Sequence, residues 1–283
     1  MIAITGANGN LGRATVSFLF DRTVPRNIVA VVRDASKVQD YAEAGIQVRV
    51  ADYNDPASMR RAFGDVEKVL QISTSSYGEQ AMREEQNVVR AAKEQDVKHI
   101  VYTSILKPGD HVHFLAGRVC GNTERLIKNS GMHYTIFRNS MYFELIPFLI
   151  GSALKDGQVY YPGGRGKVSY ISMPDIAEAL ANVLTGGNHR NVAYNITGSE
   201  AYGFDDIAGM LHSEKGIKAR YIDVPAKAYH TELLKFGMSG QEADFHISMA
   251  NSVKAHEFSQ TDDVIEKLLQ RRRRTLPEFI RTI

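Results

Sequence analysis

The 283-residue sequence predicts an α/β fold, a doubly wound parallel sheet with a smaller C-terminal α/β lobe. Two patterns predict it. Short apolar runs rich in Val and Ile alternate with amphipathic segments through the first half, which is the order expected of βαβ units. A glycine-rich turn also joins the first apolar run to the segment after it. The runs do not alternate with polar residues, so both faces of the sheet should be covered by helices.

Six strands are predicted in the first half of the chain. The segment 86–96 is typical of the helices between them, with apolar residues on one face and charges on the other. A helix over 122–131, ended by Gly131, should precede the sixth strand at 133–139. The other five strands are the apolar runs at residues 2–5, 27–32, 48–53, 68–73 and 99–104.

After about residue 150 the pattern loosens. Residues 160–167 are predicted to form a turn-rich loop, and Thr275 with Glu278 has the spacing of a capping box that opens a short final helix. We therefore expect a main domain over 1–150 and a smaller, substrate-facing lobe over 151–283 that partly returns to the main sheet. The elements expected in this lobe are a strand and helix in 168–184, a strand in 192–198, a helix in 204–216 and a strand in 219–225.

Composition limits the class of protein. The formal charge of +2 gives no electrostatic case for a nucleic-acid partner. No apolar stretch approaches the length of a membrane span, and the first residues lack the pattern of a signal peptide. Cys120 is the only cysteine, so no disulfide can form within the chain. These features suit a cytoplasmic protein, either a monomer or a homodimer.

The opening turn has glycines at Gly6, Gly9 and Gly12, directly after the apolar residues 2–5. Such a turn between a buried strand and a helix presents backbone N–H groups and a positive helix end, where a pyrophosphate binds. Gly6 should permit the tight turn, Gly9 the approach of phosphate, and Gly12 the packing of helix on strand. The spacing is Gly-x-x-Gly-x-x-Gly, and an ordinary strand–helix turn is the alternative. The context favours the dinucleotide site of a Rossmann-type fold.

The end of the second strand indicates which dinucleotide is preferred. An acidic residue there binds the ribose hydroxyls of NAD, whereas arginine accommodates the additional phosphate of NADP. Arg33 occupies this position and Lys37 lies one turn later, while Asp34 between them is able to blur the preference. A solvated charged loop is the alternative reading. We expect NADP(H) to be preferred, with NAD(H) still possible.

Several stretches resemble the NmrA-like atypical short-chain dehydrogenases, especially type 2 NAD(P)H:quinone oxidoreductases and triphenylmethane-dye reductases. They follow the family's order over most of the chain, and none of them identifies a substrate. The matching stretches are ITGANGNLG, IVAVVRDASK, VRVADYNDPASM, VKHIVYTS, HYTIFRNSMY and the later DIAEALANVL and YNITG.

The resemblance implies roles for individual residues at the ends of the strands. The opening turn would hold the pyrophosphate, and the residues after the later strands would reach the adenine, the ribose and the nicotinamide. Helix capping is the alternative for each short polar side chain. The implied cofactor-binding residues are Gly6, Ala7, Asn8, Gly9, Asn10, Leu11, Gly12, Arg33, Lys37, Asp52, Tyr53, Ile72, Ser73, Thr74, Ser75, Thr103, Ser104, Arg138, Asn139 and Tyr142.

The sequence lacks the Tyr-x-x-x-Lys pair with which most short-chain dehydrogenases move a proton. Tyr102, Tyr134, Tyr142 and Tyr229 are followed four residues later by Leu, Arg, Ile and Leu. In that pair the lysine lowers the tyrosine's pKa so that it works at neutral pH. Its absence counts against an alcohol dehydrogenase or sugar epimerase. A quinone is a strong electrophile with less need of the pair, and no catalytic residue is assigned.

Four other features carry weaker expectations. His111 and His113 lack a third ligand, so we expect a loop over the substrate mouth and no metal site. The basic run 271–274 is interpreted as a solvated helix face. Segment 140–150 should be mostly core, with Tyr142 and Phe143 able to form an apolar wall for a flat ring. Cys120, where relatives often carry Lys or His, is expected to be a buried, inert thiol.

The sequence therefore predicts an NADPH-dependent reductase that transfers hydride to a quinone-like or small aromatic acceptor. Ser104, Tyr142 and Phe143 are the expected contacts of this small-molecule acceptor, together with the loop 104–114. The alternative is a non-catalytic NADP(H)-sensing regulator of the NmrA type, with the same fold and cofactor site. The missing Tyr-x-x-x-Lys pair is compatible with both.

Overall fold

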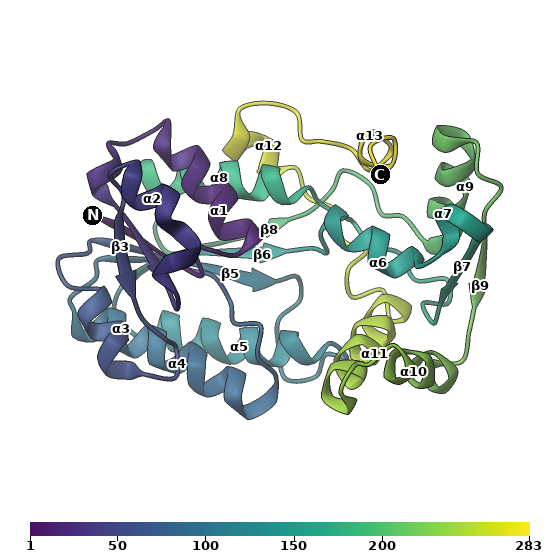
Figure 1. Cartoon of the computed structure of the whole chain (residues 1–283), viewed down its shortest axis with the longest axis horizontal. Coiled ribbons are helices and arrows are strands. Elements are labelled where there is room, and N and C mark those ends of the chain that lie inside the picture. Colours follow the sequence, from purple (N-terminus) through teal and green to yellow (C-terminus); the bar gives the residue numbers. More distant parts are fainter.

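The computed structural model describes all 283 residues and contains a seven-stranded sheet in the order β3-β2-β1-β4-β5-β6-β8 (Figure 1). Every neighbouring pair is parallel, which confirms the predicted fold class. The order reverses between β1 and β4, where open α/β sheets form their ligand crevice. The strands are β1 (Ile2–Thr5), β2 (Ile28–Val32), β3 (Gln47–Val50), β4 (Lys68–Gln71), β5 (His99–Ile105), β6 (His133–Asn139) and β8 (Val192–Ile196).

Helices cover both faces of this sheet (Figure 1). One face carries α1 (Asn10–Phe20), α2 (Gln39–Glu43), α8 (Met173–Thr185) and α12 (Val264–Leu269). The other carries α3 (Pro56–Ala62), α4 (Gly78–Glu94) and α5 (Leu115–Lys128). Apolar strand residues are buried against both layers, as expected for strands without polar alternation. No helix combines the length and apolar character that crossing a membrane requires.

The remaining elements gather beyond the C-terminal ends of the strands (Figure 1). Their core includes Tyr161 stacked on Phe204, with ring centroids 4.3 Å apart. The chain also returns to the main sheet through β8 and α8, while the division at residue 150 stays a prediction. The elements are a parallel pair, β7 (Gln158–Tyr161) and β9 (Arg220–Asp223), with α6 (Ile146–Ile150), α7 (Ala153–Asp156), α9 (Phe204–Lys215), α10 (Ala226–Lys235), α11 (Gly240–Lys254) and α13 (Leu276–Ile280).

Two local expectations for this region are wrong. Residues 160 and 161, expected in a loop, belong to β7. Residues 168–171, expected as a strand, form only isolated bridges, Val168 with Tyr202 and Ile171 with Tyr142, because no partner runs alongside them for a second pair. The short final helix is confirmed. Its capping box is formed, with the Thr275 N–H donating to the Glu278 carboxylate at 2.7 Å.

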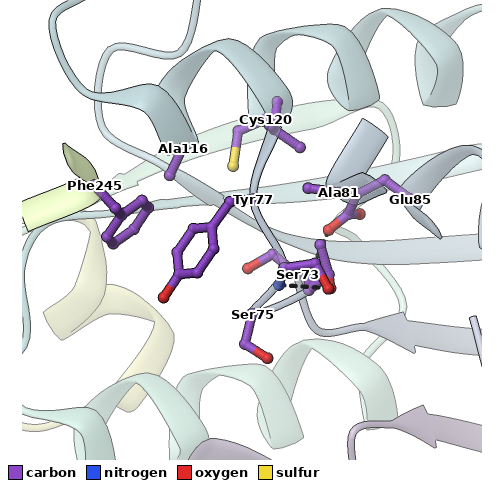
Figure 2. Close-up of a pocket in the computed structure, with 11 residues that line it drawn as sticks. Ser73, Ser75, Tyr77, Ala81, Glu85, Ala116, Cys120 and Phe245 are labelled. Carbon is purple, nitrogen blue, oxygen red and sulfur yellow. Dashed lines mark hydrogen bonds between the residues drawn. The ribbon is translucent and has the colours of Figure 1, made fainter. Parts of the chain in front are cut away.

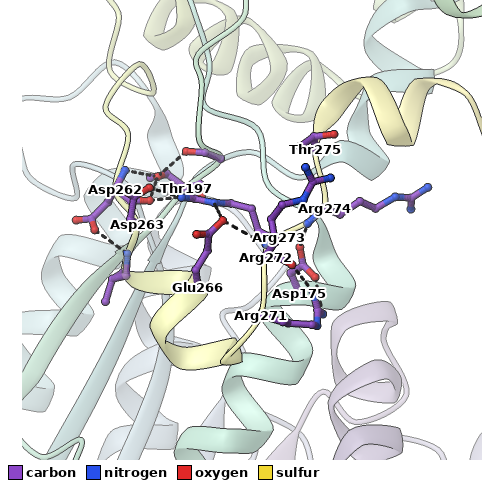
Figure 3. A network of polar contacts seen from close by, with 12 residues as sticks. Asp175, Thr197, Asp262, Asp263, Glu266, Arg271, Arg272, Arg273, Arg274 and Thr275 are labelled. Atoms are coloured by element: carbon purple, nitrogen blue, oxygen red, sulfur yellow. Dashed lines mark hydrogen bonds and ion pairs between the residues drawn. The ribbon is translucent and has the colours of Figure 1, made fainter.

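The basic run 271–274 is not a solvated helix face, so that expectation is wrong (Figure 3). It is non-helical chain between α12 and α13, and the Arg273 side chain is only 2% exposed. The Arg273 guanidinium donates to the carbonyl oxygen of Thr197 at 2.8 Å and to Glu266 at 3.1 Å. It also donates to the carbonyl oxygen of Asp262 and pairs with Asp263. The arginine therefore fastens the C-terminal segment to the end of β8.

Replacing Arg273 should destabilise the fold more than replacing its neighbour. Arg273→Ala leaves buried acceptors without a donor, so we expect the free energy of unfolding to fall by about 3 kcal/mol. Arg272 is 68% exposed and pairs only at the surface with Glu278, so Arg272→Ala should cost less than about 1 kcal/mol. Urea denaturation of both variants measures the difference. Equal losses would contradict the role given to Arg273.

Candidate functional site

A cavity of about 410 Å³ lies beyond the C-terminal ends of β1, β2, β3 and β4 and is called the larger cavity below. It occupies the crevice where the strand order reverses. Residues that follow four separate strands meet there because parallel strands end at the same edge. The predicted cofactor residues that line it are Gly6, Asn8, Gly9, Arg33, Lys37, Asp52, Tyr53, Ile72, Ser73, Thr74 and Ser75.

The glycine turn has the backbone geometry that its sequence predicts. Gly6 has φ +60°, a conformation that disfavours a side chain. A Cβ on Gly12 would lie 2.3 Å from the Gly6 carbonyl oxygen, so only glycine permits this approach of α1. A Cβ on Gly9 would stand 3.3 Å from the same oxygen, at the cavity wall. The helix starts at Asn10 without a side-chain cap or an acidic residue in its first turn, which leaves N–H groups for an anion.

Of the remaining residues of the turn, Ala7, Leu11 and Gly12 are buried behind it and Asn10 is exposed. Ala7, Asn10, Leu11 and Gly12 do not line the larger cavity. Ala7 is fully buried, and its carbonyl oxygen accepts a hydrogen bond from the Tyr41 hydroxyl at 3.1 Å. Leu11 and Gly12 are buried as α1 packs onto the sheet. Any direct contact of these four residues with a cofactor stays a prediction.

Two cations face the larger cavity after β2. Arg33 and Lys37 are exposed and form no ion pair within the chain. Asp34, which the sequence left as a competing group, caps the short helix η2 (Ala35–Val38) instead. Its carboxylate accepts from the Ser36 hydroxyl at 2.6 Å and from the Ser36 N–H at 3.0 Å, and these bonds lower its pKa. Asp34 also lines the cavity, so this end holds two cations against its one carboxylate.

The segment Ser73–Tyr77, called the serine loop below, forms another wall. The Thr103 hydroxyl on β5 accepts a hydrogen bond from the Ser73 N–H at 2.9 Å and so positions the loop. Glu84 on α4 accepts from the Ser76 hydroxyl at 3.0 Å and from the Thr74 hydroxyl. Burial would raise the pKa of Glu84, but these hydrogen bonds, with those from Gln80 and Asn54, outweigh it and lower the pKa.

A smaller cavity of about 200 Å³ adjoins the larger one, and residues 73–76 line both (Figure 2). The rings of Tyr77 and Phe245 lie 4.8 Å apart in its wall, and Phe245 comes from α11. Most of the remaining lining is apolar. The residues that line only the smaller cavity are Tyr77, Ala81, Glu85, Ala116, Val119, Cys120 and Phe245.

Sequence reasoning did not find these residues as a site. Tyr77 directly follows the serine run, so its position in the sequence could have indicated it as a site residue. Phe245 belongs to a helix without a motif, so only the fold brings it to the cavity. Cys120 is buried, as predicted, and burial raises its pKa to about 12, which keeps the thiol protonated.

Several predicted site residues line neither cavity. The Glu124 carboxylate on α5 is 4% exposed and accepts from the Ser104 hydroxyl at 2.8 Å and the Arg138 guanidinium at 2.6 Å. These contacts join α5 to β5 and β6. The Asn139 amide donates to the Tyr142 hydroxyl at 3.3 Å, and burial raises the pKa of Tyr142 to about 12. The roles of these four residues toward cofactor or acceptor stay predictions.

The expectation for Phe143 is wrong. Its side chain is 1% exposed and packs on Phe279 in the core beyond the sheet, with ring centroids 5.4 Å apart. It cannot form a wall for an acceptor. His113, in the predicted mouth loop, contacts Glu257 through its ring at 2.7 Å. No group of three or more metal-ligating side chains is present.

Comparison with known proteins places the chain among dinucleotide-dependent reductases. The NAD(P)H-binding family model matches residues 6–186. Quinone oxidoreductase 2 of Escherichia coli is 35% identical over 99% of this chain and 97% of its own length. The NAD(P)H azoreductase of Xenophilus azovorans is 27% identical over 99% of this chain and 96% of its own.

Solved structures agree with these matches. Triphenylmethane reductase from Citrobacter sp., crystallised with NADP(H), superposes with a TM-score of 0.92 and 29% identity over 100% of this chain and 99% of that chain. The NADPH complex of the Escherichia coli quinone oxidoreductase gives a TM-score of 0.93 and 32% identity over 99% of this chain and 98% of that chain. The likeness therefore extends over both the sheet and the elements beyond it.

The close approach at Gly12 can be tested by adding one methyl group. Gly12→Ala places a Cβ against the Gly6 carbonyl, so we expect a loss of about 1–3 kcal/mol in the free energy of unfolding. Gly209 lies within α9 with nothing within 4 Å of an added Cβ, so Gly209→Ala should be neutral or stabilise by up to about 1 kcal/mol. Thermal unfolding of the two variants compares them. A neutral Gly12→Ala would refute the packing described.

Proposed function

The chain belongs to the NAD(P)H-binding family, and we propose that it is an NADPH-dependent reductase that transfers hydride to a quinone or another small aromatic acceptor. The observation that carries the proposal is the pair of adjoining cavities with the serine loop as their common wall. One has the glycine turn and cations that a dinucleotide requires. The other has aromatic and aliphatic walls that suit a flat ring.

The residues of the larger cavity fit NADPH. The uncapped start of α1 and the bare wall at Gly9 suit the pyrophosphate. Arg33 and Lys37 carry the unpaired positive charge that the additional phosphate of NADPH would neutralise. Asp52, Tyr53 and residues 72–75 are proposed to contact the adenosine and the path to the nicotinamide. When bound, NADPH supplies a hydride from its nicotinamide ring.

The smaller cavity is proposed to hold the acceptor. Tyr77 and Phe245 offer aromatic faces, and Ala116 and Val119 leave room for a thin ring beside them. This replaces the expected position between Tyr142 and Phe143. A quinone carries its own electrophilic carbonyl groups, so positioning and exclusion of water supply most of what the protein must add. The absent Tyr-x-x-x-Lys pair is consistent with such an acceptor.

Removing the positive charge of Arg33 should lower the affinity for NADPH much more than the affinity for NADH. One charge-assisted hydrogen bond contributes about 1.5–3 kcal/mol, so Arg33→Ala should weaken NADPH about tenfold to a hundredfold and leave NADH little changed. Isothermal titration calorimetry measures both affinities. Arg26→Ala, at an exposed arginine outside the cavity, is the matched control. Equal weakening of NADPH and NADH would remove the assignment of Arg33.

Reductase activity is tested by following nicotinamide absorbance with a panel of quinones and cationic dyes. Loss of absorbance that requires both protein and acceptor is the expected result. Tight NADPH binding without turnover of any acceptor would instead favour the sensor.

The acceptor position is tested by Phe245→Ala, which should raise the KM for the acceptor about tenfold because an aromatic wall is lost, with NADPH affinity unchanged. Phe236→Ala is the control, since Phe236 is 84% exposed and outside both cavities. If Phe245→Ala and Phe236→Ala have the same KM for the acceptor, the acceptor does not bind against Phe245.

A further inference from the structure

Reduction of a quinone consumes a proton as well as a hydride, and the chain lacks the usual proton-donating pair. The smaller cavity nevertheless has a carboxyl group in its wall. Glu85 on α4 has no exposed surface and lies beside the serine loop (Figure 2). Its neighbour Glu84 faces the larger cavity. A carboxyl group this deeply buried costs free energy, and its hydrogen-bond partners, the Thr74 N–H and the Gln71 amide, are neutral.

Glu85 has contacts that hold it in place and contacts that lead towards the cavity. One oxygen accepts from the Thr74 N–H at 2.7 Å, and the Gln71 amide contacts the other. The buried Tyr102 hydroxyl lies near enough to the same carboxyl group to influence its pKa. That hydroxyl donates its one proton to the Cys120 sulfur at 3.4 Å, so its oxygen is left to accept from a protonated Glu85. Cys120 lines the cavity. Carboxyl, phenol and thiol therefore form a continuous series.

We infer that Glu85, Tyr102 and Cys120 form a buried proton-donating chain that ends at the acceptor cavity and supplies the proton consumed in acceptor reduction. The inference rests on the proposed function. Tyr102 and Cys120 act as relays, because a hydroxyl and a thiol can each accept one proton while giving up another. Glu85 is the group that finally loses the proton.

The step balances without any oxidant beyond those of the proposed reaction. The acceptor gains a hydride and becomes an anion with charge on oxygen. The S–H bond of Cys120 breaks as that oxygen takes its proton, the Tyr102 proton moves to sulfur, and the Glu85 proton moves to the phenolic oxygen. Cys120 and Tyr102 end as they began, and Glu85 ends as a carboxylate. Water that enters after product release returns its proton.

The surroundings of Glu85 favour a carboxyl group that still holds its proton near neutral pH. Burial raises its pKa to about 7, and the charge of Glu84 acts in the same direction, while the hydrogen bonds from Thr74 and Gln71 oppose it. Tyr53, Tyr102 and Cys120 are the other titratable groups near it. Burial raises the pKa of all three, so they stay neutral. Glu85 alone changes charge in this range.

The first test compares the pH dependence of wild type and Glu85→Gln. The single-turnover rate of quinone reduction with saturating NADPH should fall in wild type as the pH rises through about 7, because the donor must be protonated. Glu85→Gln should be slower at pH 6 by about tenfold, less than a general acid usually contributes, since a quinone is easily reduced. Its profile should be flat. A Glu85→Gln profile that keeps the wild-type fall would overturn the inference.

Matched variants separate proton transfer from packing. Cys120→Ala and Cys120→Ser both remove the thiol, but only serine can relay a proton. We expect Cys120→Ala to be slowed about as much as Glu85→Gln, and Cys120→Ser to keep most of the rate. Glu84→Gln removes contacts to the serine loop, but its single-turnover rate should still fall as the pH rises through about 7. Equal rates in the two Cys120 variants would exclude Cys120 as a relay.

A measurement on the protein without cofactor tests the carboxyl group directly. The infrared carbonyl band of a protonated carboxyl group should disappear as the pH rises through about 7 in wild type and be missing from Glu85→Gln. If no acceptor is reduced at any pH, the proposed reductase function fails. If wild type reduces quinones but the infrared band or the pH profile does not depend on Glu85, only the proton chain fails.

Discussion

The close contact between Gly12 and the Gly6 carbonyl is the constraint on which the arrangement of the cavities depends. It lets the first turn of α1 lie directly beyond β1, so that free N–H groups open into the crevice between β1 and β4. From that start α1 runs along α8, which lies between β7 and β8 in sequence. One backbone approach thus fixes both the anion end of the larger cavity and the packing of two distant parts of the chain.

Two adjacent glutamates on α4 show how local contacts give similar residues different properties. Glu84 and Glu85 both hold the serine loop, yet the pKa of Glu84 is lowered and that of Glu85 is raised. Four side chains donate hydrogen bonds to Glu84, and these bonds stabilise the carboxylate by more than burial destabilises it. Glu85 has fewer donors and no exposed surface. The same helix therefore presents a carboxyl group of lowered pKa to one cavity and a carboxyl group of raised pKa to the other.

Most of the sheet and half of the candidate site could be predicted from the sequence, because local patterns specify them. Buried strands appear as apolar runs, and the glycine spacing and Arg33 lie within one strand–turn–helix unit. The errors arise where contacts with residues distant in sequence determine whether a side chain is buried or reaches the site. A basic run reads as solvated, yet Arg273 is buried because β8 and α12 present acceptors to it. Phe245 was missed because it reaches the site across 168 residues from Tyr77, a separation no local pattern encodes.

The contact between Tyr77 and Phe245 has a consequence for how this architecture diversifies. The larger cavity is built by the sheet and its first helices, while one side of the smaller cavity, where we propose the acceptor, comes from α11, far along the chain. Mutations in that single helix can reshape the smaller cavity for other compounds without disturbing the larger cavity, where we propose the dinucleotide. Proteins of this architecture that use the same dinucleotide can thus differ in the acceptors they reduce, with the sequence changes confined to one helix.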